Sequence, residues 1–97
     1  MSDEITVTQN LGENRYEVHS SGTLAGFAEY QLPDEEHVDF THTTVDDDFS
    51  GEGLAERLVA EAIADVQQRG KRVVPHCSYV AKWLTEHPEH DDIVDWP

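Results

Sequence analysis

The chain has 97 residues, of which 37% are hydrophobic, with one cysteine and 21 acidic against six basic residues, for a formal net charge of −15. This length allows one small domain over residues 1–97 and excludes two separate cores. The single cysteine excludes an internal disulfide framework, and no apolar run approaches the roughly 20 residues of a membrane span.

The charge limits the partners of the protein. Its negative surface would repel nucleic-acid phosphate and an anionic membrane face, so we expect neither partner. The acidic residues are spread along the whole chain, which favours adaptation to a high-salt cytoplasm, where screening tolerates self-repulsion. A surface that attracts cationic substrates is the alternative. Residues 1–4 lack the basic and apolar regions of a signal peptide, so a cytoplasmic location is expected.

The first half of the chain has the two-residue periodicity of β-strands. Turn-forming residues separate four such stretches, which predicts a four-stranded antiparallel meander. The expected strands cover residues 5–8, 15–19, 23–30 and 37–45. In the last strand we expect Val38, Phe40, His42 and Thr44 to share one face, because side chains alternate along a strand.

The second half changes to helical periodicity. Apolar residues recur at three- and four-residue spacing from about Gly53 to Arg69, and charged residues occupy the other face. A short strand at residues 71–75 and a second helix at residues 78–86 follow. A strand, a helix and another strand suggest one crossover unit. The sequence therefore predicts an α/β (α+β) fold, with a compact, mixed, mainly antiparallel sheet flanked by two principal helices.

A glycine turn, Gly51-Glu52-Gly53, joins the last strand of the meander to the long helix. Glycines let an anion approach the main chain closely, and the positive end of the helix dipole adds attraction. The turn is not a Walker loop, since it lacks the Lys-Ser/Thr pair, and the third Rossmann glycine is absent. Either a phosphate site or a tight strand-to-helix corner fits this pattern.

Cys77 follows the short strand and opens the second helix, a position at which reactive thiols are found in other proteins. His42 lies on the preceding long strand, which the crossover could place beside Cys77. A cysteine and a histidine at adjacent strand ends can form a nucleophile and its base. A buried structural cysteine and an ordinary strand histidine are the alternatives.

Four side chains were candidates for a zinc site: His76, Cys77, His87 and His90. Only two residues separate the last two histidines, whereas zinc motifs usually leave three to five, and there is no CxxC pair. We therefore predict no metal.

Four segments, taken together, resemble a known family. They are residues 39–45, 49–55, 73–80 and 87–89, which read DFTHTTV, FSGEGLA, VVPHCSYV and HPE. In this order they are similar to the small single-domain acetyltransferases of the GNAT superfamily, and more narrowly to its Yjdj-type or NATD-like members. The resemblance covers roughly Phe40 to Val94, over half of the chain.

The resemblance implies that the protein binds acetyl-coenzyme A. Residues 49–55 match the pyrophosphate loop of the superfamily, Q/R-x-x-G-x-G/A, with Ser50 in the first position, Gly53 in the fourth and Ala55 in the sixth. Ser50 replaces the usual Arg or Gln, which removes one phosphate partner. The implied cofactor-binding residues are Thr43, Thr44 and Val45, whose backbone would pair with pantetheine, and Ser50, Gly51, Glu52, Gly53, Leu54 and Ala55.

The resemblance further implies transfer of acetyl to an amine acceptor, either a small amine, a peptide N-terminus or a protein lysine. Cys77 would lie beside the thioester with His42 nearby, as the two candidate catalytic residues. A neutral amine could attack the thioester directly with His42 as base, or Cys77 could carry the acetyl group first. A monomer or a homodimer is expected. The alternative is a non-catalytic module that binds coenzyme A, acetyl-coenzyme A or another protein.

Overall fold

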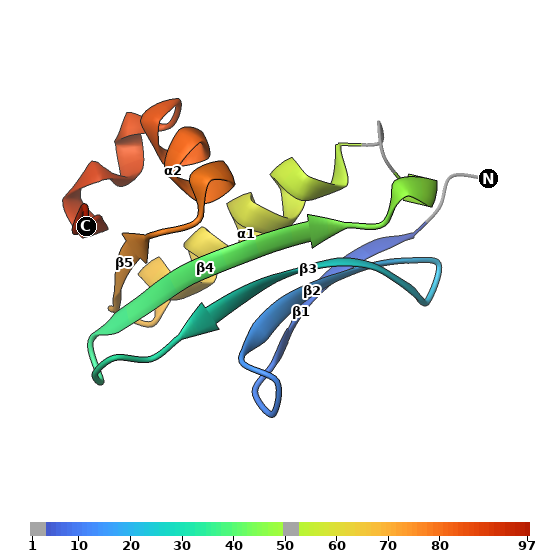
Figure 1. The fold of residues 1–97 in the computed structure, drawn as a ribbon, viewed down its shortest axis with the longest axis horizontal. Coiled ribbons are helices and arrows are strands. Elements are labelled where there is room, and N and C mark those ends of the chain that lie inside the picture. The colour runs from blue at the N-terminus through green and yellow to red at the C-terminus, as the bar shows by residue number, and fades with distance from the viewer. Residues whose placement is uncertain (1–3, 50–52) are drawn as a thin grey trace.

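Five strands form one sheet in the order β1-β2-β3-β4-β5, with helices packed against it (Figure 1). The computed structural model describes residues 4–49 and 53–97. The strands are β1 (Ile5–Asn10), β2 (Arg15–Ser20), β3 (Thr23–Gln31), β4 (His37–Val45) and β5 (Arg72–Pro75). The helices are α1 (Leu54–Gln68) and α2 (Ser78–Thr85), with short 3-10 turns η1 (Asp47–Phe49) and η2 (Pro88–Ile93).

The sheet is antiparallel from β1 to β4 and parallel between β4 and β5. The parallel pair requires a long connection, which α1 supplies. The predicted meander, the two principal helices and the mixed, mainly antiparallel sheet are therefore confirmed. No helix in the described ranges is long and apolar enough to cross a membrane.

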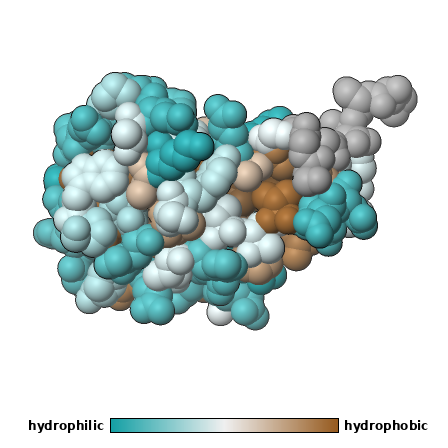
Figure 2. All heavy atoms as spheres, turned by 45° about the horizontal axis from the view of Figure 1, so that its top comes forward, coloured by the Kyte–Doolittle hydropathy of each residue, from teal (hydrophilic) through white to brown (hydrophobic). Residues whose placement is uncertain are grey.

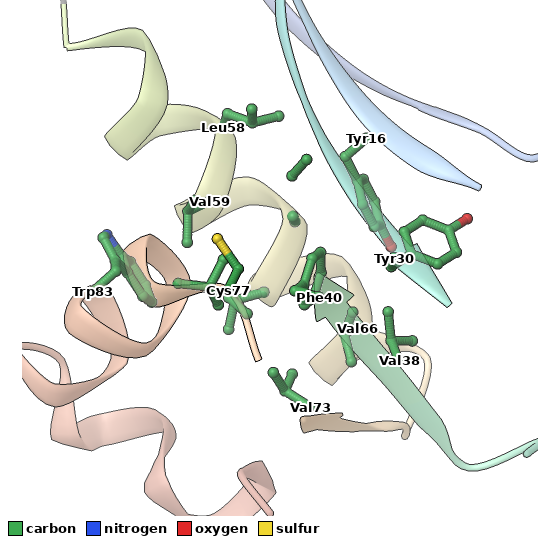
Figure 3. Packing of buried hydrophobic residues seen from close by; sticks show 14 of the residues in the cluster. Tyr16, Tyr30, Val38, Phe40, Leu58, Val59, Val66, Val73, Cys77 and Trp83 are labelled. Atoms are coloured by element: carbon green, nitrogen blue, oxygen red, sulfur yellow. The ribbon is translucent and has the colours of Figure 1, made fainter. Parts of the chain in front are cut away.

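The two helices and the sheet share one hydrophobic cluster (Figure 3). Phe40 of β4, Leu58 and Ile63 of α1, and Leu84 of α2 are among its fully buried side chains. A hydrogen bond also joins the sheet to α1, because the hydroxyl of Tyr16 donates to Oδ2 of Asp65 over 2.6 Å. Burial, and then the Asp65 carboxylate, hold the pKa of Tyr16 far above its ordinary value. The phenol therefore stays protonated as a donor.

The opposite face of the sheet carries mainly polar side chains. Along β4, His37 and Asp39 alternate with the buried Val38 and Phe40, so they lie on the side away from this cluster. Glu29 of β3 is exposed on the same side. We call this surface the open face of the sheet.

The last residues of the chain are joined to the edge of the sheet. Val94 bridges Val73 of β5, and the carboxylate of Asp95 accepts hydrogen bonds from Nε and Nη2 of Arg72 at 2.6 and 2.9 Å. His37 lies between two carboxylates, with Nδ1 at 2.8 Å from Asp34 and Nε2 at 2.8 Å from Asp95. This cluster connects β4, β5 and the C-terminal segment.

The cluster predicts a pH-dependent stability. Hydrogen bonds first to Asp34 and then to Asp95 raise the pKa of His37, so protonated His37 is favoured in the folded chain. That contribution is complete below the unfolded histidine pKa of about 6.5 and is lost as pH rises through the raised folded value. Arg72 and then His37 lower the pKa of Asp95 to about 2, so its contribution is lost only as pH falls toward that value.

We therefore expect the urea-derived free energy of unfolding to fall as pH rises above about 6.5. His37→Asn should lack this part of the fall, whereas His19→Asn, which changes a histidine outside the cluster, should keep it. The same pH profile in His37→Asn and in the wild type would contradict the assigned role of His37.

Candidate active site

The strands β4 and β5 run side by side for only four residue pairs, from His37 and Arg72 to Phe40 and Pro75. Beyond this point of divergence β4 continues to Val45, paired with β3 on its other side. In the described part of the chain, residues 41–45 have no strand neighbour on the β5 side. An extended ligand could therefore bind to this free strand edge through its own amide groups.

A bulge changes which side chains of β4 face the helices. His42 pairs with Glu29 and Phe40 with Tyr30, so Thr41 is an extra residue in β4. After it, Thr43 takes the helix side, while His42 is exposed. The prediction that Val38, Phe40, His42 and Thr44 share one face is therefore wrong, because an inserted residue breaks the two-residue alternation.

Cys77 is the residue at which the chain leaves β5 for α2. Its N–H donates to the carbonyl of Phe40 over 2.7 Å, and its side chain is only 7% exposed within the same hydrophobic cluster as Val59 and Trp83 (Figure 3). Its Sγ shares a hydrogen bond with Oγ1 of Thr43 at 3.3 Å.

His42 has a different partner, since its Nε2 lies 2.7 Å from Oγ1 of Thr44. The structure thus joins Cys77 to Thr43 on the helix side and places His42 on the exposed side. It does not bring Cys77 and His42 together as a hydrogen-bonded pair.

Among the described residues, no side chain caps the start of α1. Gly53 adopts a left-handed conformation, with φ of 71°, directly before Leu54. The N–H groups of the first helical turn have no partner within a helix, and they carry its positive dipole end. Ser50, Gly51 and Glu52, predicted to belong to this loop, lie outside the described residues.

A cavity of about 290 Å³ opens between the end of β4 and the start of α1. Its lining comprises Val45, Phe49, Gly53, Leu54, Ala55, Glu56 and Tyr79. Figure 2 shows hydrophobic side chains gathered in one patch, toward the right of the view. A neighbouring cavity of about 120 Å³ shares Glu56 and Tyr79 and adds Lys82, Trp83 and Glu86.

The sequence did not predict that Tyr79 lines this cavity. It stands one residue after the first residue of α2, a position whose proximity to α1 only the packing of the two helices reveals. Burial, and then the charges of Glu56 and Glu86, raise the pKa of Tyr79, so its hydroxyl is protonated at neutral pH.

A hydrogen-bonded pair that the sequence did not predict, His76 and Asp39, lies on the open face. Nδ1 of His76 is 2.7 Å from Oδ1 of Asp39. The two residues are 37 positions apart, and they meet because Phe40, next to Asp39, pairs with Pro75, next to His76. The β4–β5 register could have identified this pair, but the sequence does not specify that register.

The remaining candidate metal ligands have structural partners. The ring of Trp83 stacks on His87 at 3.8 Å and lies 5.5 Å from His90. Nδ1 of His87 bonds the carbonyl of Trp83, and Nδ1 of His90 bonds the side chain of Gln67. Within residues 4–49 and 53–97, no group of three or more His, Cys, Asp or Glu side chains could hold a metal ion.

A larger groove, of about 750 Å³, lies near the other end of α1. Its lining includes Leu11, Leu32, Val38, Arg69 and Lys71. Its lining includes neither residues 41–45 of β4 nor the first turn of α1.

Comparison with known proteins identifies the family. Residues 15–93 match the model of the GCN5-related N-acetyl-transferase family, so the chain belongs to that family. The family consists of acyltransferases that use acetyl-coenzyme A as cosubstrate. No curated protein matches this sequence.

Solved structures share the fold. A GCN5-like protein of Staphylococcus aureus aligns with a TM-score of 0.71 and 17% identity, over 95% of this chain and 89% of its own. The ribosomal-protein-S18-alanine N-acetyltransferase of Escherichia coli aligns with a TM-score of 0.62 and 23% identity, over 82% of this chain. This chain spans only 54% of that enzyme's length.

Alanine substitutions at two glycines of similar conformation test whether the start of α1 binds the cosubstrate. Gly53 and Gly70, at opposite ends of α1, have φ of 71° and 72°, and an added Cβ would meet no atom of the described residues within 4 Å at either. Alanine at either position should cost about 1–2 kcal/mol of stability, because the left-handed conformation is strained with a Cβ.

Only Gly53→Ala should also weaken acetyl-coenzyme A binding, by about tenfold, since it alone disturbs the backbone beside the cavity. Isothermal titration calorimetry measures both variants. Equal affinities of Gly53→Ala and Gly70→Ala would place the cosubstrate elsewhere.

Proposed function

We propose that this protein transfers the acetyl group of acetyl-coenzyme A to a primary amine. The observation that carries the proposal is the free edge of β4 at residues 41–45, which leads into the cavity at the start of α1. A strand edge and a helix N-terminus, in line, offer backbone donors first to an amide-containing arm and then to phosphates.

In the proposed arrangement the pantetheine arm lies along residues 42–45, and the pyrophosphate lies at residues 49–55. The arm carries two amides, which can pair with the backbone of Thr43, Thr44 and Val45 in the manner of an added strand. Gly53, Leu54 and Ala55 contribute backbone N–H groups near the phosphates. Ser50, Gly51 and Glu52 complete the proposed loop, with Ser50 in place of a cationic or amide side chain.

The charge of the protein opposes this binding at low salt. The chain carries a net charge of −15, and the cosubstrate is also an anion. At ionic strengths near 1 M the Debye length falls to about 3 Å, so the long-range repulsion is screened while backbone hydrogen bonds remain. Adaptation to a high-salt cytoplasm would therefore also favour cosubstrate binding.

The thioester would lie near Cys77, where β4 and β5 diverge. Two routes fit this placement. In the direct route, the neutral amine attacks the thioester carbonyl after a histidine on the open face, such as His42, has taken its proton. In the covalent route, Cys77 thiolate accepts the acetyl group and passes it to the amine. Burial of Cys77 and its bond to Thr43 favour the direct route.

A non-catalytic module that binds acetyl-coenzyme A is the second candidate. One observation favours it: Cys77 is hydrogen-bonded to Thr43 and not to His42, so these two candidate catalytic residues do not form a nucleophile–base pair. Release of free coenzyme A on addition of an amine separates an enzyme from such a module.

The test is a titration with acetyl-coenzyme A in molar KCl, followed by the intact mass of the protein and by an assay for free coenzyme A thiol with a panel of amines. We expect saturable binding and amine-dependent thiol release. A mass increase of one acetyl group that disappears in Cys77→Ser would select the covalent route, and an unchanged mass would select the direct one.

Thr43→Val is the matched variant, because it removes the hydroxyl beside Cys77 and keeps the thiol. It should not abolish any acetyl adduct that Cys77→Ser abolishes. Absence of acetyl-coenzyme A binding in high salt would contradict the proposed function.

A further inference from the structure

The residues on either side of the β5–α2 junction lie on opposite faces of the sheet. Cys77 is buried on the helix side, whereas the side chain of His76 is 53% exposed on the open face, bonded to Asp39. Both follow Pro75, the last residue that pairs with β4. A reacting carbonyl at the point of divergence would therefore have Cys77 on one side and His76 on the other.

The bond to Asp39 determines which nitrogen of His76 is available. An ionised carboxylate only accepts hydrogen bonds, so Nδ1 of His76, 2.7 Å from Oδ1, must carry the proton. In the neutral ring the lone pair is then on Nε2. In the described part of the chain Nε2 of His76 has no hydrogen-bond partner, so it is free to accept a proton.

Asp39 also fixes the ring in space. Its own side chain is 19% exposed and stands on β4, a central strand of the sheet. A half-exposed imidazole would otherwise rotate freely, and a carboxylate bonded to the far nitrogen is the usual way in which proteins orient a histidine base.

We propose that His76, oriented by Asp39, is the proton acceptor for the amine, and that the amine approaches over the open face. The inference rests on the proposed acetyl transfer and applies to both of its routes. Asp39 is a positioning residue, and His76 is the catalytic one.

An alkylammonium acceptor must lose two protons to become an acetamide. Nε2 of His76 takes one proton from the alkylammonium acceptor, and the neutral amine forms a C–N bond to the acetyl carbon. The C–S bond then breaks, and the sulfur leaves with its electron pair and takes the second proton from the attacking nitrogen. His76 releases its proton to solvent. The products are the acetamide and a free thiol.

His42 lies on the same face but is less suited to this role. Its Nε2 is bonded to Oγ1 of Thr44 at 2.7 Å, and its cross-strand neighbour Glu29 forms no hydrogen bond to it within the described residues. Glu29 and His42 are the neighbouring titratable groups on this part of the face. His37, further along β4, also has carboxylate partners, but Asp34 and Asp95 occupy both of its ring nitrogens. Within the described residues His76 differs in that its Nδ1 is held by a carboxylate while its Nε2 has no partner. In this proposal His42 contacts the acceptor and does not take its proton.

The need for a base depends on the class of acceptor. A primary alkyl amine, with a pKa near 10 like that of lysine, is almost wholly protonated at neutral pH and gains from proton removal. An arylamine is already neutral there and gains little. The proposed role of His76 should therefore matter for alkyl amines and hardly at all for arylamines.

This difference provides the test. The steady-state kcat/KM would be measured in high salt near neutral pH with benzylamine and with 4-methylaniline, which have similar size. His76→Asn should lower the value for benzylamine by about 100-fold and that for 4-methylaniline by less than about threefold. Asp39→Asn should lower the benzylamine value by about tenfold, because an amide oxygen is a weaker acceptor for the Nδ1 proton and the amide NH2 can donate to Nδ1 instead, which would leave the ring proton on Nε2. His19→Asn, on β2, is the control and should change neither value.

Chemical rescue separates lost chemistry from lost structure. Free imidazole should restore benzylamine turnover in His76→Ala and have no effect on the wild type, while acetyl-coenzyme A affinity stays unchanged in every variant. Equal losses for the two amines, full activity of His76→Asn, or no rescue would overturn the role of His76 alone. A wild type that binds acetyl-coenzyme A but acetylates neither amine would overturn the proposed transfer itself, and this inference with it.

Discussion

The divergence of β4 from β5 is the constraint on which the rest of the site depends. Pro75 has no N–H to extend the ladder, and the N–H of Cys77 bonds the carbonyl of Phe40 instead. The chain then turns into α2, while β4 runs on to Val45. One side of β4 is thereby left with free backbone groups. The same turn places Cys77 inside the core and His76 on the open face.

The proposed phosphate binding would depend mainly on backbone groups. Of the described residues that line the two cavities near the start of α1, only Lys82 is cationic, and Glu56 and Glu86 line the same cavity as Lys82. Backbone N–H groups at a helix N-terminus keep their partial charges whatever the salt concentration, and side chains are not needed for them. A strongly acidic protein can therefore hold an anion at this point, provided that salt screens the rest of its surface.

Much of the fold could be predicted from the sequence, because local patterns determine it. The stripe through Leu54, Leu58 and Ile63 specified α1, and alternation specified the strands of the meander. The bulge at Thr41 could not be predicted, since no glycine or proline marks it, and it reversed the expected placement of Thr43 and Thr44. The expected orientation of the β4 side chains after Thr41 was therefore wrong, while the assignment of the site to this strand stays a prediction.

The long-range pairings were beyond the sequence for a different reason. His76 and Asp39 meet because of the parallel register between β4 and β5, in which Phe40 pairs with Pro75. Tyr79 reaches the cavity because α2 packs beside the start of α1. Residues 50–52 lie outside the described ranges, so the loss of a phosphate partner at Ser50 stays a prediction.

The location of the cosubstrate is the central claim, and amide chemical shifts test it most directly. Acetyl-coenzyme A would be titrated into ¹⁵N-labelled protein in high salt. The account predicts that the largest shift changes fall on residues 42–45, 53–55 and Cys77. Changes that fall instead on Leu11, Leu32 and Lys71, around the larger groove near the other end of α1, would contradict it.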